Sequence, residues 1–256
     1  MGAGDAKLNY PLQSFSADDR AEPRKRLMAL FESSPLPKEH LMVNLGMYQR
    51  SSVVAKFLYL NELYQQIIDI PGIIMEFGVW WGQTLIQFQN LRAVYEPYNH
   101  TRKVVGFDTF EGYSAPSNQD AHSALVQAGQ YAVSADYILY LTEIMKYHDE
   151  ENGIDKFAKF ELVKGDASLM TARYLEDRPE TIIALAYLDM QLYEPTRDCL
   201  RAILPHMVKG SVIAMDELNC RDFPGETVAF KEVVGLGRFT AKRSRFLPDR
   251  TYFVIG

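Results

Sequence analysis

Acidic side chains stand at the ends of several strand-like runs in this sequence. Glu76, Asp108 and Asp189 each follow a run of apolar residues, and the pair Asp216 and Glu217 follows another. In open parallel sheets, ligands bind beyond the carboxyl ends of the strands, so these carboxylates can meet at one cleft. Oxygen ligands of this kind suit Mg²⁺ or a similar hard cation. The alternative is that Asp189 caps the helix after it and that Asp216 lies in a turn.

A glycine turn joins the first of these runs to a helix. The sequence passes from Ile73 through Glu76 to the pair Gly78 and Gly82, and the apolar positions then take helical spacing. Glycines let a ligand approach the backbone, and a helix N-terminus offers free N–H groups and a partial positive charge. At the end of the next strand, Asp108 can accept two hydroxyls of a ribose. These features indicate a site for an adenosine-containing cofactor. The alternatives are a purely structural glycine turn and, for Asp108, a turn or N-cap aspartate.

Two further stretches carry candidate site residues. The segment 113–133 has no strong hydrophobic period and includes proline, glycine, serine and asparagine. A loop this long in a compact domain is usually functional, so we expect a lid there. After the strand expected at 160–163, Asp166 either meets the edge of an adenine or caps the helix that starts at Ser168.

The elements that must position these residues alternate between strand and helix along most of the chain. We expect strands at 73–76, 103–110, 160–163, 182–190, 210–215, 239–246 and 251–255. We expect helices at 17–33, 49–70, 134–148, 193–207 and 225–234, with two more after Gly82 and from Ser168. The run 182–190 has no polar break before Asp189, which is typical of a central strand buried on both faces. This alternation predicts a doubly wound, mostly parallel α/β sheet, which the last two strands can close as an antiparallel hairpin.

The composition favours one large α/β domain with a short appendage. The chain has 256 residues, of which 47% are hydrophobic and 23% charged, so we expect an N-terminal helical cap over 1–70 and the α/β domain over 71–256. The formal net charge of -6 argues against a nucleic-acid partner. No apolar run reaches about 18 residues, so we expect no membrane span. Because Cys199 and Cys220 form no disulfide framework and no secretory signal pattern opens the chain, we expect reduced thiols in a cytoplasmic protein.

Several common catalytic patterns are missing from the sequence. The five histidines are scattered and show no zinc-ligand spacing. There is no Gly-x-Ser-x-Gly turn for a nucleophilic serine and no Gly-x-x-x-x-Gly-Lys-Ser/Thr loop for phosphates.

Five motifs, in order along the chain, resemble the macrocin O-methyltransferase (TylF-type) family. They are Pro71–Gly82 (Pro-Gly-Ile-Ile-Met-Glu-Phe-Gly-Val-Trp-Trp-Gly), Gly106–Gly112, Leu188–Thr196, Met215–Glu217 and Phe223–Gly225. The resemblance runs from about Leu45 to the end and implies a class I S-adenosylmethionine (SAM) methyltransferase fold, Rossmann-like, with a seven-stranded sheet. It also implies an enzyme that uses SAM and a divalent metal such as Mg²⁺ to methylate a sugar hydroxyl of a natural product. Nucleotide-sugar methyltransferases are the members that the chain resembles most.

The resemblance assigns a role to each matching position. The methionine end of SAM would be lined by Glu76, Gly78, Val79 and Gly82. The ribose would be held by Asp108, with Thr109 and Phe110 beside it. The adenine would be flanked by Asp166 and Ala167. The metal would be held by Asp189, Asp216 and Glu217.

Two positions depart from the family pattern. Glu217 stands where the family usually has aspartate, although it keeps a carboxylate. Gln191 stands where related enzymes have a second aspartate, the proposed general base, and an amide cannot take a proton at neutral pH. The catalytic candidates are therefore Asp189, Gln191 and, as a base on the lid, His122, with Glu111 as another possible base. The other route is a metal that lowers the pKa of the sugar hydroxyl enough for solvent to accept the proton.

Three other functions are compatible with parts of the pattern. One is a metal-independent methyltransferase in which the acids only cap helices, and another is a SAM-binding subunit without catalysis. A nicotinamide dehydrogenase fits less well, because the glycine spacing departs from its fingerprint and no Tyr-x-x-x-Lys pair follows. In the N-terminal helices, Tyr59, Leu60 and Tyr64 are within reach of a partner, so we expect a homo-oligomer.

Overall fold

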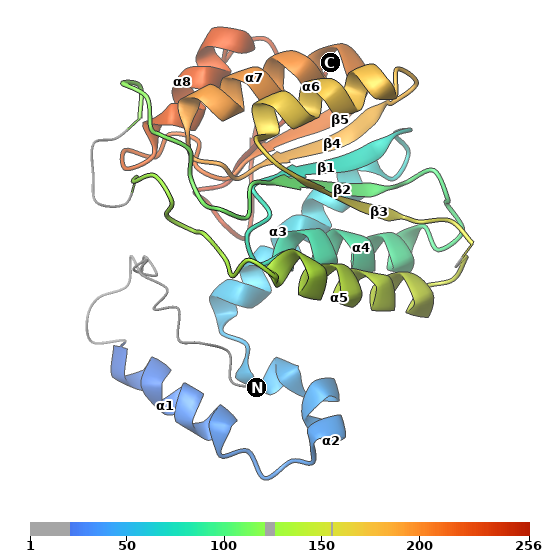
Figure 1. Cartoon of the computed structure of the whole chain (residues 1–256), viewed down its shortest axis with the longest axis vertical. Coiled ribbons are helices and arrows are strands. Elements are labelled where there is room, and N and C mark those ends of the chain that lie inside the picture. The colour runs from blue at the N-terminus through green and yellow to red at the C-terminus, as the bar shows by residue number, and fades with distance from the viewer. Residues whose placement is uncertain (1–20, 121–125, 155) are drawn as a thin grey trace.

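The computed structural model describes residues 21–120, 126–154 and 156–256, and within them one twisted sheet forms the centre (Figure 1). Its strands are β1 (Ile73–Phe77), β2 (Val104–Asp108), β3 (Phe160–Lys164), β4 (Ile183–Leu188), β5 (Met207–Met215), β6 (Thr240–Arg243) and β7 (Thr251–Val254). Their order is β3-β2-β1-β4-β5-β7-β6. The first five are parallel, and β7 runs antiparallel to both β5 and β6. This arrangement confirms the predicted doubly wound, mostly parallel sheet and its closing hairpin.

Helices cover both faces of the sheet. The helices of the described residues are α1 (Ala21–Glu32), α2 (Lys38–Val43), η2 (Leu45–Tyr48), α3 (Ser51–Ile67), α4 (Gln83–Tyr95), α5 (Tyr137–Glu151), α6 (Ala167–Asp177), α7 (Tyr193–Ile203), η3 (Leu204–His206) and α8 (Pro224–Val233). In Figure 1, α6, α7 and α8 lie above the sheet and α3, α4 and α5 below it. The two layers follow from right-handed crossovers between parallel strands.

Successive residues along a strand point to opposite faces of the sheet, so the strands contribute to two separate hydrophobic cores. Ile74 and Leu185 point to the core between the sheet and α3, α4 and α5. Met75 and Ala186 point to the core between the sheet and α6, α7 and α8. Every residue of β4 is buried, as the unbroken apolar run predicted for a central strand.

Some boundaries differ from the sequence expectation. The helix expected over 193–207 ends at Ile203, because Pro205 has no N–H for a further helical turn and Met207 already pairs with Ile183 in the sheet. The strand expected over 239–246 is confined to Thr240–Arg243. The short helices α2 and η2 were not predicted.

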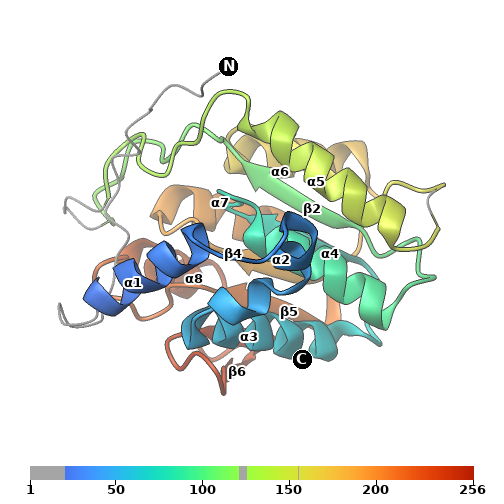
Figure 2. The same cartoon turned by 90° about the horizontal axis from the view of Figure 1, so that it is seen from below.

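The N-terminal segment divides into two parts. Figure 1 shows α1 and α2 set apart from the sheet, and Figure 2, seen from below, shows them in front of it, whereas α3 packs against the sheet. Tyr59, Leu60 and Tyr64 on α3 are at most 1% exposed, so the expectation that they reach a partner was wrong: they fill the core. In the described part of the chain, we find no helix with the length and apolar character to span a membrane.

Candidate active site

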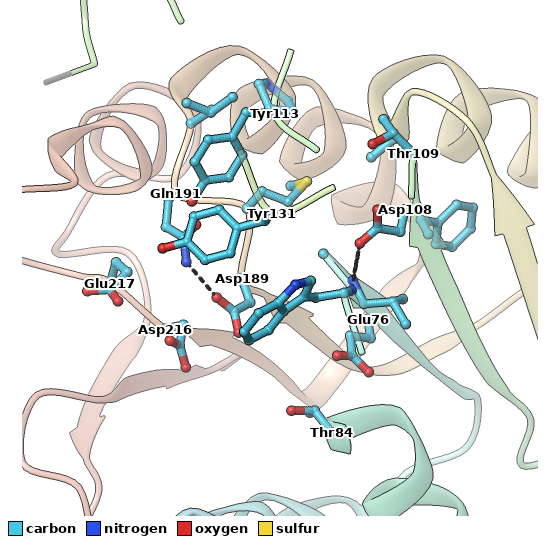
Figure 3. Close-up of a pocket in the computed structure, with 18 of the residues that line it drawn as sticks. Glu76, Thr84, Asp108, Thr109, Tyr113, Tyr131, Asp189, Gln191, Asp216 and Glu217 are labelled. Atoms are coloured by element: carbon cyan, nitrogen blue, oxygen red, sulfur yellow. Dashed lines mark hydrogen bonds between the residues drawn. The ribbon is translucent and has the colours of Figure 1, made fainter. Parts of the chain in front are cut away.

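The carboxyl ends of β1, β2, β4 and β5 border one cavity of about 740 Å³, within the range of small-molecule sites (Figure 3). Its lining includes these predicted site residues: Glu76, Gly78, Val79, Asp108, Thr109, Asp166, Ala167, Asp189, Gln191, Asp216 and Glu217. Gly82, the N-cap of α4, and Phe110, which packs into the core, lie outside that lining. His122 lies outside the described residues.

The glycine turn after β1 is built around the carboxylate of Asp108. Its Oδ2 accepts the N–H groups of Val79 and Trp80 at 2.7 and 2.8 Å, and its Oδ1 accepts the N–H of Phe110 at 2.6 Å. These bonds hold Trp80 at a φ of 50°, a left-handed conformation that is costly for a non-glycine residue. Gly78 is required here because a Cβ would lie 2.2 Å from the carbonyl oxygen of Asp189. A carboxylate offers about four acceptor positions, so Asp108 keeps capacity for one further donor.

Glu76 brings a buried carboxyl group with one unpaired oxygen to the floor of the cavity. Its side chain is 1% exposed, and its Oε2 has no hydrogen-bond partner. Burial raises the pKa of Glu76 well above its ordinary value, and Lys56 opposes that rise. An unpaired buried carboxylate oxygen beside a glycine turn fits a ligand that carries an ammonium or sulfonium group, as the methionine end of SAM does.

Two cations that were not predicted from the sequence lie beside the acids at the ends of β4 and β5. Arg250, from the turn before β7, lies with its Nε 2.8 Å from Oδ1 of Asp216 and an Nη 3.9 Å from Oε1 of Glu217. Lys56, on α3, lies 4.0 Å from Oδ2 of Asp189. Burial is the largest cause, and repulsion from Asp216 the second, of a pKa raised to about 7 for both Asp189 and Glu217.

The predicted metal site is not assembled by these side chains as they lie. Asp189, Asp216 and Glu217 are hard oxygen donors, which suits Mg²⁺ chemically. However, the described residues contain no group of three acidic, histidine or cysteine side chains placed to hold a metal ion. The guanidinium of Arg250 instead supplies the positive charge beside Asp216.

Gln191 orients Asp189, and a buried glutamate fixes the loops that carry the rim acids. The Nε2 of Gln191 donates to Oδ1 of Asp189 at 3.0 Å (Figure 3). Glu226, fully buried, accepts the N–H groups of Met190 and Gln191 through Oε1 and that of Glu217 through Oε2. Glu226 was not predicted from the sequence. It directly follows the Phe223–Gly225 motif, which is the sequence feature that could have pointed to it.

Aromatic rings form one wall of the cavity. Trp80 contacts both Trp81 and Tyr131, with ring centroids 5.5 Å apart in each pair, and Tyr131 contacts Tyr113 at 5.0 Å. Tyr131 also lies at the positive φ of 64°. Tyr113 and Tyr131 belong to the segment expected to act as a lid, and rings placed there exclude water from the reacting groups.

The remaining predicted residues have simpler surroundings. Asp166 caps α6, because its carboxylate accepts the N–H of Ser168 at 2.8 Å, and it lines the cavity as well. The capping alternative is therefore confirmed, and the contact with adenine stays a prediction. Glu111 lies outside the cavity lining, 75% exposed and paired with Lys164 at 3.0 Å, so its position does not support a role as base.

The strand order, together with a cavity over the glycine turn and the strand-end acids, matches the class I SAM-dependent methyltransferase fold. The chain belongs to the macrocin-O-methyltransferase (TylF) family, whose model matches residues 55–236.

Known proteins agree with this assignment. The calicheamicin methyltransferase CalS11 is 38% identical, with a TM-score of 0.92 over 95% of each chain. A structure of apo CalS11, described as a TDP-rhamnose 3'-O-methyltransferase, is 37% identical, with a TM-score of 0.84 over 95% of this chain and 97% of that one. The 8-demethyl-8-(2,3-dimethoxy-alpha-L-rhamnosyl)-tetracenomycin-C 4'-O-methyltransferase of Streptomyces olivaceus is 27% identical over 208 residues, 71% of each protein. The O-methyltransferase NovP shares the fold at 16% identity and a TM-score of 0.60, over 79% of this chain and 80% of that one.

Proposed function

We propose that this chain transfers the methyl group of SAM to a hydroxyl of a deoxysugar carried by a nucleotide. The observation that carries the proposal is a single cavity in which the unpaired Glu76, the glycine turn and the rim acid Asp189 all meet. The similarity to CalS11 over 95% of the chain supports a TDP-rhamnose-like substrate.

Different residues of the cavity would bind different parts of SAM. Glu76, Gly78 and Val79 would hold the methionine end of SAM, Asp108 and Thr109 the ribose, and Asp166 and Ala167 the adenine. When bound, SAM supplies an electrophilic methyl group on a positively charged sulfur. The aromatic wall and the glycine turn would help to align the two reactants, and such alignment supplies much of the rate enhancement in group transfer.

Asp189 is the side chain placed to handle the proton of the sugar hydroxyl. It faces the cavity, Gln191 fixes its Oδ1, and Lys56 stands beside its Oδ2. As the new bond between the sugar oxygen and the methyl carbon forms and the sulfur–carbon bond breaks, Asp189 accepts the hydroxyl proton. Lys56 and Arg250 balance the negative charge of the rim.

A divalent cation is the second part of the proposal. Asp189, Asp216 and Glu217 would hold it once Arg250 had left Asp216, and it would lower the pKa of the bound sugar hydroxyl. The observed pairing of Arg250 with Asp216 favours the other arrangement, a metal-independent methyltransferase in which Arg250 remains the rim cation.

The test is methyl transfer from SAM to TDP-rhamnose, followed by mass spectrometry, with SAM affinity measured separately by calorimetry. We expect Asp189→Asn to lower kcat by about 100-fold or more while SAM affinity stays within about twofold. The exposed Asp177→Asn on α6 is the control. Full activity in Asp189→Asn would remove the role of Asp189, and SAM binding without transfer to any sugar nucleotide would leave a non-catalytic SAM-binding subunit.

Chelation decides between the two rim arrangements. Loss of activity in EDTA that Mg²⁺ restores supports the divalent cation. Activity that persists after thorough chelation supports the Arg250 arrangement, and Arg250→Met should then abolish turnover.

We also propose that the chain forms a homo-oligomer through α1, α2 and η2. Neither α2 nor η2 buries any of its residues. Helices this short are not stable alone in water, so a second copy that covers them would account for their apolar surface.

A further inference from the structure

A second, smaller cavity adjoins the active site between α3 and the start of α4. Its lining is Gln49, Val53, Lys56, Phe57, Leu60, Gln83 and Gln87. Lys56 and Gln83 line both cavities, so the two spaces are neighbours. The second cavity measures about 220 Å³, below the roughly 300–1,000 Å³ of a complete ligand site, and therefore suits one part of a larger ligand.

The side chains of this second cavity suit a flat heterocycle with both donors and acceptors. Gln83 and Gln87 are four residues apart on α4 and face the same side of the helix, opposite Gln49. Each amide offers a carbonyl oxygen and an NH₂ group, and among the described residues none hydrogen-bonds to these three amides. Phe57 is 41% exposed and presents an aromatic ring on which a base can stack.

Lys56 stands at the boundary between the two cavities. Its Nζ is 4.0 Å from Asp189, longer than a hydrogen bond, so its donors are not used by that carboxylate. A lysine side chain ordinarily carries a positive charge at neutral pH, and Lys56 lines both cavities. A cation there can face an anionic linker that passes from one cavity to the other.

We propose that the second cavity is a pyrimidine-base subsite and that Lys56 meets the diphosphate of a nucleotide sugar whose sugar lies in the main cavity. This inference rests on the proposed function, because it assigns a place to each part of that substrate. The base would stack on Phe57 and exchange hydrogen bonds with Gln83 and Gln87.

Binding of TDP alone, measured by calorimetry, tests the subsite without any methyl transfer. We expect Gln83→Ala to weaken TDP binding about three- to tenfold and Phe57→Ala about tenfold or more. Asn90→Ala is the matched control, since Asn90 lies further along the same face of α4 outside the cavity lining and should leave TDP affinity unchanged. TDP affinity that is undetectable, or equal in all four proteins, would overturn the subsite, as would GDP binding as tightly as TDP.

Kinetics separate this inference from the proposed function. With wild-type protein, we expect kcat/KM to be much higher for TDP-rhamnose than for rhamnose 1-phosphate. Gln87→Ala and Phe57→Ala, at two residues that line only the second cavity, should lower kcat/KM for TDP-rhamnose while changing it little for rhamnose 1-phosphate. Equal losses on both substrates would refute the base subsite and leave methyl transfer standing, whereas TDP binding that depends on Gln83 without methylation would refute the proposed function and leave the subsite standing.

Discussion

The carboxylate of Asp108 accepts three backbone N–H groups from two loops before any ligand binds. The sequence suggested either a ribose acceptor or a turn aspartate at this position, and the structure shows the turn role directly. A strained Trp80 depends on these bonds. Binding of a ribose would therefore use an acceptor that the fold has already oriented.

Asp108→Ala should destabilise the protein without SAM, because Val79, Trp80 and Phe110 lose their acceptor together. Hydrogen bonds to charged groups contribute about 1.5–3 kcal/mol, so we expect a loss of about 2–3 kcal/mol and a Tm about 5 °C lower by calorimetry. Asp166→Ala is the control, since it removes one exposed capping bond and should cost about 1 kcal/mol. An unchanged Tm combined with lost SAM affinity would show that Asp108 serves only the ligand.

The sequence led to the rim acids and not to their partners, for a physical reason. An acid directly after a buried strand has a predictable position, because all parallel strands end at the same edge of the sheet. Lys56 arrives from a helix that precedes the sheet, and Arg250 arrives from a turn near the end of the chain. No local pattern marks either cation, and only the packing of α3 and the antiparallel pairing of β7 brings them to the rim.

At the scale of elements, one buried ion pair ties three chain segments together. Arg102 is 1% exposed and donates to the carbonyl groups of Ile67, at the end of α3, and of Ile70 and Gly72, in the turn before β1. Its Nε also lies 2.9 Å from Oε2 of Glu96, just after α4. These contacts of Arg102 set how α3 and α4 approach each other. They therefore also set the space between the two helices where the second cavity lies.

The stability that the Arg102–Glu96 pair contributes should be lost at acid pH. Burial raises the pKa of Glu96, but hydrogen bonds from Arg102, Tyr64 and Asn99 outweigh burial and hold that pKa below 4.5. The unfolded chain then binds a proton more readily than the folded one, so this contribution is present above about pH 4.5 and is lost as the pH falls through the lowered folded value. Urea unfolding between about pH 3 and 7 should show Glu96→Gln less stable at neutral pH and with a flatter decline in acid.

The exposed Glu143→Gln provides the comparison for that measurement, because Glu143 is 71% exposed and pairs with Lys146 on the same helix. It should follow the wild-type curve. A Glu96→Gln curve parallel to wild type from neutral to acid pH would show that Glu96 does not cause the acid sensitivity.

The alternation of elements was predictable, whereas their ends and the smallest helices were not. Unbroken apolar runs mark strands that are buried on both faces, and an apolar period of 3.6 marks the helices between them, which is enough to place central strands such as β1 and β4. The end of α7 at Ile203 depends on the pairing of Met207 with Ile183, a contact distant in sequence. The six residues of α2 span too few turns for a period to show.

At the scale of the whole molecule, the N-terminal helices are the part that the sheet does not explain. Met42, Val43 and Met47 are 70%, 86% and 66% exposed, and Figure 2 shows α1 and α2 on the outside of the fold. Apolar side chains exposed together in this way are typical of a surface that another protein covers. The core, by contrast, is complete within one chain, so association is not needed to bury α3.

A second copy on this surface gives a direct prediction. Light scattering coupled to size-exclusion chromatography should give the wild-type protein a mass of at least twice 29.2 kDa. The double variant Met42→Glu, Val43→Glu should shift it toward the monomer, because charges in an apolar contact lose their hydration without gaining partners. Leu139→Glu, on the 66% exposed position of α5, should keep the wild-type mass. A wild-type monomer would refute association, and an unchanged oligomer in the double variant would place the contact away from α2.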